Sequence, residues 1–405
     1  MEISKHKLIY YFVGIDLLIV LTQVKLYLPL LNIIFILFLI PLVISTLRWE
    51  NVLRSKSILL FLLCYIILIF FALFDHGPSI YEYVYRFSRL IPLFFAGVVI
   101  SYNVKRINGV ILFAIVGLFL GGISFLFEGG SQLNIRNVMT DLSDYLRSPY
   151  RYAPPVFVTV LSFQLIKKIK NRNLKYLIII LNCFNMVTVL RSGFTAPIFV
   201  FFVCIFAYLL WACLNLRTRV GKYAVKIMQS LVGLTFCWLV LGTFFAESVV
   251  NFRMQSLLNY IFVADSFVDL DFTSGRRITL LTRSLETFIE NPIIGVGAES
   301  LSGNETRVGS HSSIFDLLAQ FGVFGFAFII MFSSWIVISY KLSRKWSSHA
   351  DISLGFFCVW VGYFAGCISN PYFLCAALDH YIFVFAGMTL GLNYKYNYGS
   401  KKQST

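Results

Sequence analysis

The sequence predicts an all-α polytopic membrane protein, built as a single membrane-embedded domain over residues 1–405. Hydrophobic residues make up 58% of the chain and charged residues only 13%, whereas soluble domains carry about 25% charged residues. The apolar residues also gather in stretches that approach the roughly 20 residues needed for a membrane-crossing helix. The distribution of lysine and arginine between these stretches then gives their orientation.

The apolar stretches predict about twelve transmembrane helices. In chain order they are placed at about 8–24, 27–46, 58–74, 88–102, 108–127, 153–166, 176–190, 196–214, 227–246, 313–340, 354–369 and 372–392.

Basic residues fall in every second connection, as expected for loops on the cytoplasmic side of a membrane. Lys5 and Lys7 place the N-terminus in the cytoplasm, and Lys395, Lys401 and Lys402 place the C-terminal tail there too. The net charge of +15 therefore follows from topology, and no nucleic-acid partner is expected. The cytoplasmic loop charges are Arg48, Arg54, Lys56, Lys105, Arg106, Lys167, Lys168, Lys170, Arg172, Lys175, Arg217, Arg219, Lys222, Lys226, Lys341, Arg344 and Lys345.

The opposite loops and span mouths carry arginine instead of lysine, apart from Lys25 in one short turn. A guanidinium fork pairs two phosphate oxygens at once, which an ammonium group cannot do. This choice of residue predicts an anion-binding outer face, although pairing with outer-loop carboxylates remains an alternative for any single arginine. The outer arginines are Arg86, Arg89, Arg136, Arg147, Arg151, Arg191, Arg253, Arg276, Arg277, Arg283 and Arg307.

The longest polar interruption predicts a large periplasmic loop over residues 247–312, between the ninth and tenth spans. Within it, an amphipathic helix is expected to start at a cap on Thr273 or Ser274 and to end at Asn291–Pro292. Gly295 and Gly297 then predict a tight turn.

The tenth span is expected to begin outside the membrane, after an N-cap at Ser310. An unbroken helix from Ser312 to Tyr340 has 29 residues and measures about 43 Å, which is longer than the bilayer core. His311 would then lie at the mouth of this helix, just above the membrane.

Four residues of this region are candidates for chemistry. Arg276 and Arg283 are seven positions apart and share a helix face, with Arg277 beside them. A positive charge near a helix N-terminus is unfavourable because it opposes the helix dipole. Arginines placed there at such a cost are expected to bind an anion. His311 is followed by Ser312 at a helix N-terminus, where the dipole keeps an imidazole neutral and able to accept a proton. The alternatives are ion pairs within the helix and a histidine that only closes the loop.

Further arginines are expected at the same depth, at the outer membrane surface. Arg147 and Arg151 are four apart where a loop re-enters the membrane, and Arg86 and Arg89 are three apart at the outer end of the fourth span. Arg191 marks the outer end of the seventh span. A solvated charge or a local ion pair is the alternative for each of them.

Other kinds of site find little support in the sequence. Outer loops contain no Walker, HExxH or GxSxG motif, and Asp269 with Asp271 is the nearest approach to a paired metal ligand. The eight cysteines fall in apolar segments without CxxC spacing and are expected to be small buried residues. Neither a metal nor a cofactor is therefore expected.

The stretch GRRITLLTRSLETFIENPIIGVG, followed by GSHSSIFDLLAQFGVFG, resembles the core of the O-antigen ligase/polymerase superfamily. Members share an arginine-led helix, an Asn-Pro-x-x-Gly-x-Gly turn, and a helix that opens with His-Asn or His-Ser and ends in a glycine pair. By this resemblance Arg277 corresponds to the family arginine and His311 to the family histidine. Gln320 stands where many members carry glutamate, so no acid role is assigned to it. Arg191–Ser192 is similar to a family Ser-Arg element in reversed order.

The resemblance implies a GT-C-like, metal-independent membrane glycosyltransferase in the bacterial inner membrane, with a periplasmic active site. Donor and acceptor would be undecaprenyl-diphosphate-linked glycans, with the bilayer and a chain-length regulator protein as further partners. His311 and Arg277 are the expected catalytic residues. The expected substrate-binding residues are Arg276, Arg191, Arg283, Arg151, Arg147, Arg89 and Arg86.

An O-antigen polymerase is favoured, because its two lipid-linked substrates suit many external arginines and the His-Ser form resembles polymerases. The alternative within the family is a ligase that transfers the glycan to lipid A–core. A flippase for the same lipid-linked glycan is the alternative from another class, and a peptidoglycan-type polymerase is a further enzyme alternative. A flippase would lack the long external loop, and a peptidoglycan-type polymerase would show an outer catalytic acid.

Overall fold

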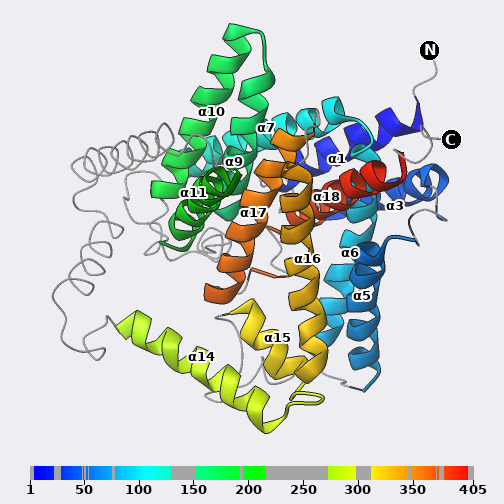
Figure 1. The fold of residues 1–405 in the computed structure, drawn as a ribbon, viewed down its shortest axis with the longest axis vertical. Helices are drawn as coiled ribbons and strands as arrows, with labels where there is room; N and C mark the ends of the chain where they lie inside the picture. The colour runs from blue at the N-terminus through cyan, green and yellow to red at the C-terminus, as the bar shows by residue number, and fades with distance from the viewer. Residues whose placement is uncertain are drawn as a thin grey trace.

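A computed structural model describes residues 4–21, 29–47, 49, 52, 54–74, 78–128, 152–191, 195–215, 272–297, 312–344, 349–370, 372–373 and 378–399. Every regular element in these ranges is a helix (Figure 1). The helices are α1 (Lys5–Leu21), α3 (Pro29–Thr46), α5 (Lys56–Phe74), α6 (Pro78–Ile100), α7 (Val104–Glu128), α9 (Ala153–Lys168), α10 (Arg172–Arg191), α11 (Thr195–Asn215), α14 (Phe272–Glu290), α15 (Ser313–Phe321), η5 (Gly322–Phe324), α16 (Gly325–Ser343), α17 (Ala350–Ser369) and α18 (Asp379–Gly399).

The predicted all-α membrane class is confirmed, whereas the number of twelve spans stays a prediction. A helix overlaps each predicted span except the ninth, 227–246, which lies outside the described residues together with most of the loop 247–312. Five helical segments of the described chain are long and apolar enough to cross a membrane by length and composition. They lie within α5, α7, α10, the α15–α16 segment and α17.

The bundle is held by close helix pairs, of which α6 with α18 is the most extensive. Gly97 of α6 and Gly387 of α18 allow this approach, since a Cβ at either glycine would collide with the backbone of the opposite helix. Lipid is as apolar as the side chains, so membrane helices associate through close packing. Small residues at the crossing points allow the backbones to come close enough for this packing. Phe61 of α5 stacks on Phe94 of α6 with ring centroids 3.8 Å apart.

The tenth span was predicted to be one continuous helix, and this prediction is wrong. Gly322 ends α15 with φ of +56°, a short 3₁₀ turn follows, and α16 starts at Gly325 in a new direction (Figure 1). The cause is tertiary packing. A Cβ at Gly322 would collide with the backbone of Ile293, and the Val323 N–H donates to the Pro292 carbonyl oxygen at 2.8 Å.

The last helix begins at Asp379, seven residues later than the predicted start of the last span at 372. Tyr372 and Phe373 do not join it because their amides bond elsewhere, to the Asn370 carbonyl at 2.9 Å and to Ser313 Oγ at 2.8 Å. His380, in the first turn of α18, is fully buried, and its Nδ1 lies 2.8 Å from Asp16 Oδ2 on α1. A buried ionisable group needs such a partner, and this one ties the first helix to the last.

Candidate functional site

The arginine-bearing helix α14 forms as the sequence predicts and lies along the edge of the molecule, next to α15 (Figure 1). It begins at Phe272, so Thr273 and Ser274 lie inside the helix and neither is the expected cap. Arg276 and Arg277 are in its first turns, although their side chains lie outside the described residues. The Arg283 side chain is described and is half-buried.

The glycine turn after α14 is confirmed and has a clear structural role. Gly295 and Gly297 have φ of +76° and +74°, a region that suits glycine. The Val296 and Gly297 N–H groups donate to the Ala319 and Gln320 carbonyls, each at 3.0 Å. These carbonyls belong to the last turn of α15, where a helix has no internal donors left. The turn therefore docks the end of α14 onto the end of α15.

The start of α15 is fixed by a different set of bonds. Its N-cap is Ser312 and not the expected Ser310, and Ser312 Oγ accepts the Phe315 N–H at 3.3 Å. The same hydroxyl donates to the Cys367 carbonyl at 3.1 Å, and the Ser313 N–H donates to the Asn370 carbonyl at 3.2 Å. The end of α17 thus anchors the residue that directly follows His311, while His311 itself lies outside the described residues.

Asp316 joins the arginine helix to the start of α15. Its Oδ1 accepts a hydrogen bond from Ser284 Oγ of α14 at 3.0 Å, and its Oδ2 accepts the Ser312 N–H at 3.3 Å. All three residues are buried: Asp316 is 7% exposed, Ser284 is 1% exposed and Ser312 is 0% exposed. The Ser312 N–H belongs to the peptide group that links Ser312 to His311, so one buried carboxylate holds both halves of the predicted site.

Sequence reasoning missed this residue. The available signal was its position four residues after the serine cap, where an acidic side chain in the first helical turn can bond back to the cap amide.

We expect Asp316→Ala to destabilise the protein by about 2–4 kcal/mol, because it leaves two buried donors without their acceptor. Asp351→Ala is the matched control, since it removes a carboxylate that is 51% exposed and pairs with Lys168; its effect should stay below about 1 kcal/mol. Thermal unfolding of both variants in the same detergent makes the comparison. Equal stability of Asp316→Ala and the wild type would contradict the bridging role.

The remaining predicted arginines fall on separate helices. Arg86 and Arg89 lie on α6 and Arg191 ends α10, while Arg147 and Arg151 lie outside the described residues, as do the side chains of Arg86 and Arg191. Arg89 is half-buried, and its guanidinium lies 5.8 Å from the centre of the Tyr85 ring. Its Nε is buried without a hydrogen-bond acceptor, and no described carboxylate pairs with it.

Across the described ranges, no group of three or more His, Cys, Asp or Glu side chains could hold a metal ion. Cys64, Cys204, Cys358 and Cys367 are buried as expected, but Cys183 is exposed, so that part of the cysteine prediction is wrong.

Fold and composition define a multi-pass, all-α membrane protein. A family model described as O-antigen ligase matches residues 176–330, which include α10, α14, the glycine turn and α15. The match supports the O-antigen ligase/polymerase superfamily, so the predicted resemblance is confirmed at that level, and members are membrane glycosyltransferase-like enzymes. Polymerase and ligase are not distinguished by it. A search of curated proteins found no match for the chain.

Proposed function

We propose that the protein is an O-antigen polymerase, which joins undecaprenyl-diphosphate-linked oligosaccharide repeat units at the periplasmic face of the inner membrane. The observation that carries the proposal is the coincidence of the family match with the Asp316 bridge. The matched segment contains the arginine helix, and the bridge holds that helix against the residue that follows His311. A ligase acting on lipid A–core is the second candidate, because the same match includes it.

The arginines bind the diphosphate groups of the lipid-linked substrates. Arg277 grips the donor diphosphate with the help of Arg276, and Arg191 supports this contact from α10. Arg283, Arg86, Arg89, Arg147 and Arg151 contribute positive charge at the same outer surface. Arg89 supports this assignment, because its buried Nε has no acceptor within the described chain and its charge faces no described carboxylate.

In the reaction, the acceptor sugar hydroxyl attacks the anomeric carbon of the donor glycan. The new glycosidic bond forms as the bond to the diphosphate breaks, and the diphosphate leaves with the electron pair. His311 takes the proton of the attacking hydroxyl as general base. Negative charge grows on the leaving diphosphate, so guanidinium groups aimed at it lower the barrier more than they stabilise the bound substrate.

Deletion of the gene followed by gel analysis of the surface glycan separates the candidate functions. A polymerase predicts loss of the ladder while a single repeat unit remains on the lipid A–core. Loss of every unit from the core would indicate the ligase. Accumulation of lipid-linked units on the cytoplasmic side would indicate a flippase.

We expect polymer formation to persist in EDTA, because the arginines supply the positive charge that a divalent ion provides in other transferases. The measurement is the initial rate with purified protein before and after chelation. Loss of activity with rescue by Mg²⁺ or Mn²⁺ would contradict the assignment of diphosphate neutralisation to arginine.

A further inference from the structure

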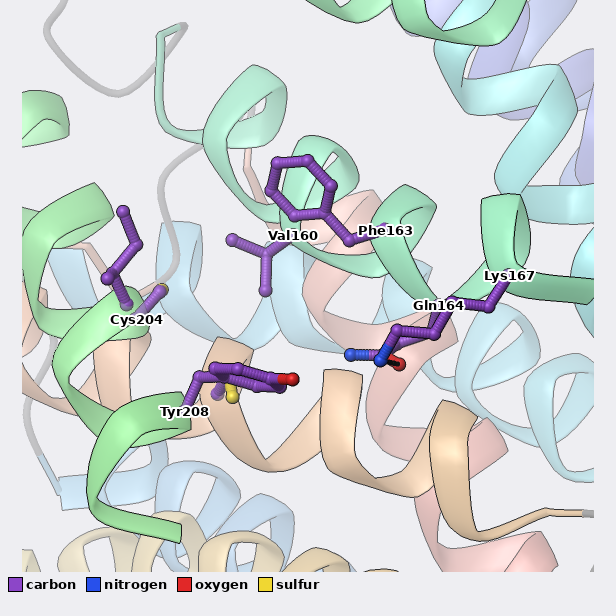
Figure 2. A pocket seen from close by; sticks show the side chains of 8 residues that line it. Val160, Phe163, Gln164, Lys167, Cys204 and Tyr208 are labelled. Atoms are coloured by element: carbon purple, nitrogen blue, oxygen red, sulfur yellow. Dashed lines mark hydrogen bonds between the residues drawn. The ribbon is translucent and has the colours of Figure 1, made fainter. Parts of the chain in front are cut away.

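A cavity of about 320 Å³ lies between α9, α11 and α17 (Figure 2). This volume is at the lower end of the range for small-molecule sites, which is roughly 300–1,000 Å³. The cavity is separate from the candidate active site, because its lining residue on α17 is Cys358 in the middle of the helix, whereas Ser312 bonds to Cys367 near the end. Its lining residues are Val160, Phe163, Gln164, Lys167, Cys204, Ile205, Tyr208 and Cys358.

The polarity of the lining changes along the helix axis. Val160 and Phe163 are apolar, whereas Gln164 and Lys167, one turn further along α9, bring polar groups to the other end beside Tyr208 (Figure 2). Val160 and Lys167 are seven residues apart, which is about 10 Å of helix. This length is most of the roughly 15 Å that one leaflet contributes to the hydrocarbon core. The cavity is therefore apolar at the Val160 end and cationic at the Lys167 end.

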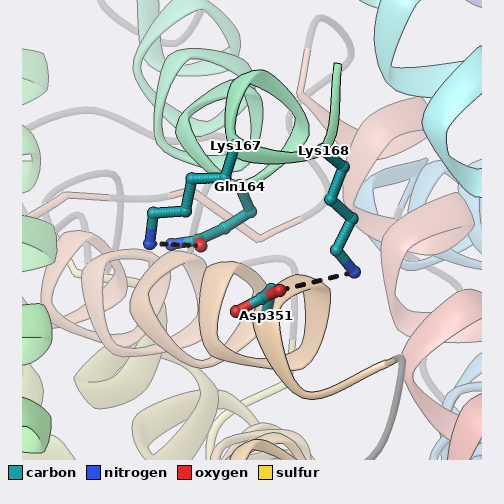
Figure 3. A network of polar contacts seen from close by, with 4 residues as sticks. All are labelled: Gln164, Lys167, Lys168 and Asp351. Atoms are coloured by element: carbon teal, nitrogen blue, oxygen red, sulfur yellow. Dashed lines mark hydrogen bonds and ion pairs between the residues drawn. The ribbon is translucent and has the colours of Figure 1, made fainter. Parts of the chain in front are cut away.

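Lys167 holds a positive charge at the mouth of this cavity. Its Nζ donates to Gln164 Oε1 at 3.0 Å and lies 5.6 Å from the centre of the Tyr208 ring. Neither neighbour is anionic, and no carboxylate in the described chain pairs with it. The adjacent Lys168 differs, because its Nζ lies 3.5 Å from Asp351 Oδ2 (Figure 3). The charge of Lys168 is therefore paired with a carboxylate, whereas the charge of Lys167 at the cavity has no such partner among the described residues.

We propose that this cavity binds an anionic phospholipid of the cytoplasmic leaflet. One acyl chain lies along Val160, Phe163 and Ile205, and the headgroup phosphate rests on Lys167. Basic pockets between helices at the cytoplasmic surface are suited to anionic headgroups. The choice of leaflet follows from the lysine-rich loop at residues 167–175, which the topology places inside.

The lipid site is separate from the glycan site. α17 has 20 residues and spans about 30 Å. Cys358 of α17 lines the cavity, and the Cys367 carbonyl that anchors Ser312 lies nine residues further along, about 13 Å of helix. The occupant of the cavity is thus a lipid other than the glycan donor engaged at the arginine helix.

The test uses the full chain in phosphatidylcholine nanodiscs that contain a minor fraction of a photoreactive lipid with a diazirine on its acyl chain. One arm uses photoreactive phosphatidylglycerol and the other photoreactive phosphatidylcholine. Labelled peptides are mapped by mass spectrometry. We expect phosphatidylglycerol to label the cavity faces of α9 and α11 several-fold more than phosphatidylcholine does. Equal labelling by the two lipids would overturn the proposal, because the cavity would then hold bulk lipid.

Two variants separate headgroup from chain. Lys167→Ala should lower phosphatidylglycerol labelling about fivefold, the effect of one basic residue near an anionic headgroup. Lys170→Ala is the matched control, since it removes the same charge from an exposed position that does not line the cavity. Ile205→Trp keeps the charge, fills the cavity and should also lower labelling. An equal loss in Lys170→Ala, or full labelling in Ile205→Trp, would contradict the proposed site.

Discussion

Replacing His311 by alanine is expected to slow polymer formation by roughly 10²- to 10⁴-fold, the usual contribution of a general base. The imidazole would accept the proton of the acceptor hydroxyl as that oxygen attacks the anomeric carbon. Donor binding should be largely unchanged, because the arginines supply it. The loss should therefore fall on kcat more than on the binding of the lipid-linked donor. The measurement is the initial rate with purified lipid-linked repeat units, together with a donor-binding titration.

The matched control is His349→Ala, which removes a histidine at the start of α17, far from the arginine helix. This variant should keep nearly the full rate. If His311→Ala also keeps its activity at normal protein levels, the base is elsewhere. A carboxylate of the outer loops, such as Asp269 or Asp271, then becomes the better candidate.

Arg277→Lys is the second large effect, with an expected loss of about 10²-fold or more in turnover, by analogy with the loss of one oxyanion donor. Lysine keeps the positive charge but loses the planar fork that bonds two phosphate oxygens together. Such a loss appears mainly in the transition state, where the leaving diphosphate gains charge. Turnover and donor affinity are measured on the same preparation.

Arg172→Lys serves as the control for this exchange. Arg172 begins α10 in the lysine-rich region and contacts Tyr176, with its Nε 3.1 Å from the tyrosine hydroxyl. Its replacement should leave turnover unchanged. Full activity of Arg277→Lys would rule out bidentate binding of the leaving group by this residue.

Much of the fold could be predicted because most helices can be recognised from their own stretch of sequence, as apolar segments bounded by basic loops. The break at Gly322 was missed because hydropathy is continuous across it, so the glycine pair of the family pattern was not interpreted as a change of direction. The docking of the 291–297 turn accompanies the bend at this point. The late start of α18 has the same kind of cause, since Phe373 is held by Ser313, which is 60 residues away in the chain.

The candidate site was predictable to a similar extent. The arginine helix and the positive-φ glycines follow from a polar stretch and a local turn pattern. Asp316 escaped prediction because it sits in an apolar segment and its bond to Ser284 joins residues 32 positions apart. Ser310 was predicted as the N-cap, but Ser312 is the N-cap in the structure. The sequence alone does not distinguish the two serines, because the contact of Ser312 with the end of α17 is a tertiary one.

The most direct test is a reconstituted reaction with the purified protein and one defined undecaprenyl-diphosphate-linked repeat unit as sole substrate. The proposed function predicts a ladder of oligomers that differ by one repeat unit, with one undecaprenyl diphosphate released for each bond formed. The His311→Ala protein should give neither product at a comparable rate. Transfer only after lipid A–core is added, or movement of the substrate across the membrane without release of undecaprenyl diphosphate, would contradict it.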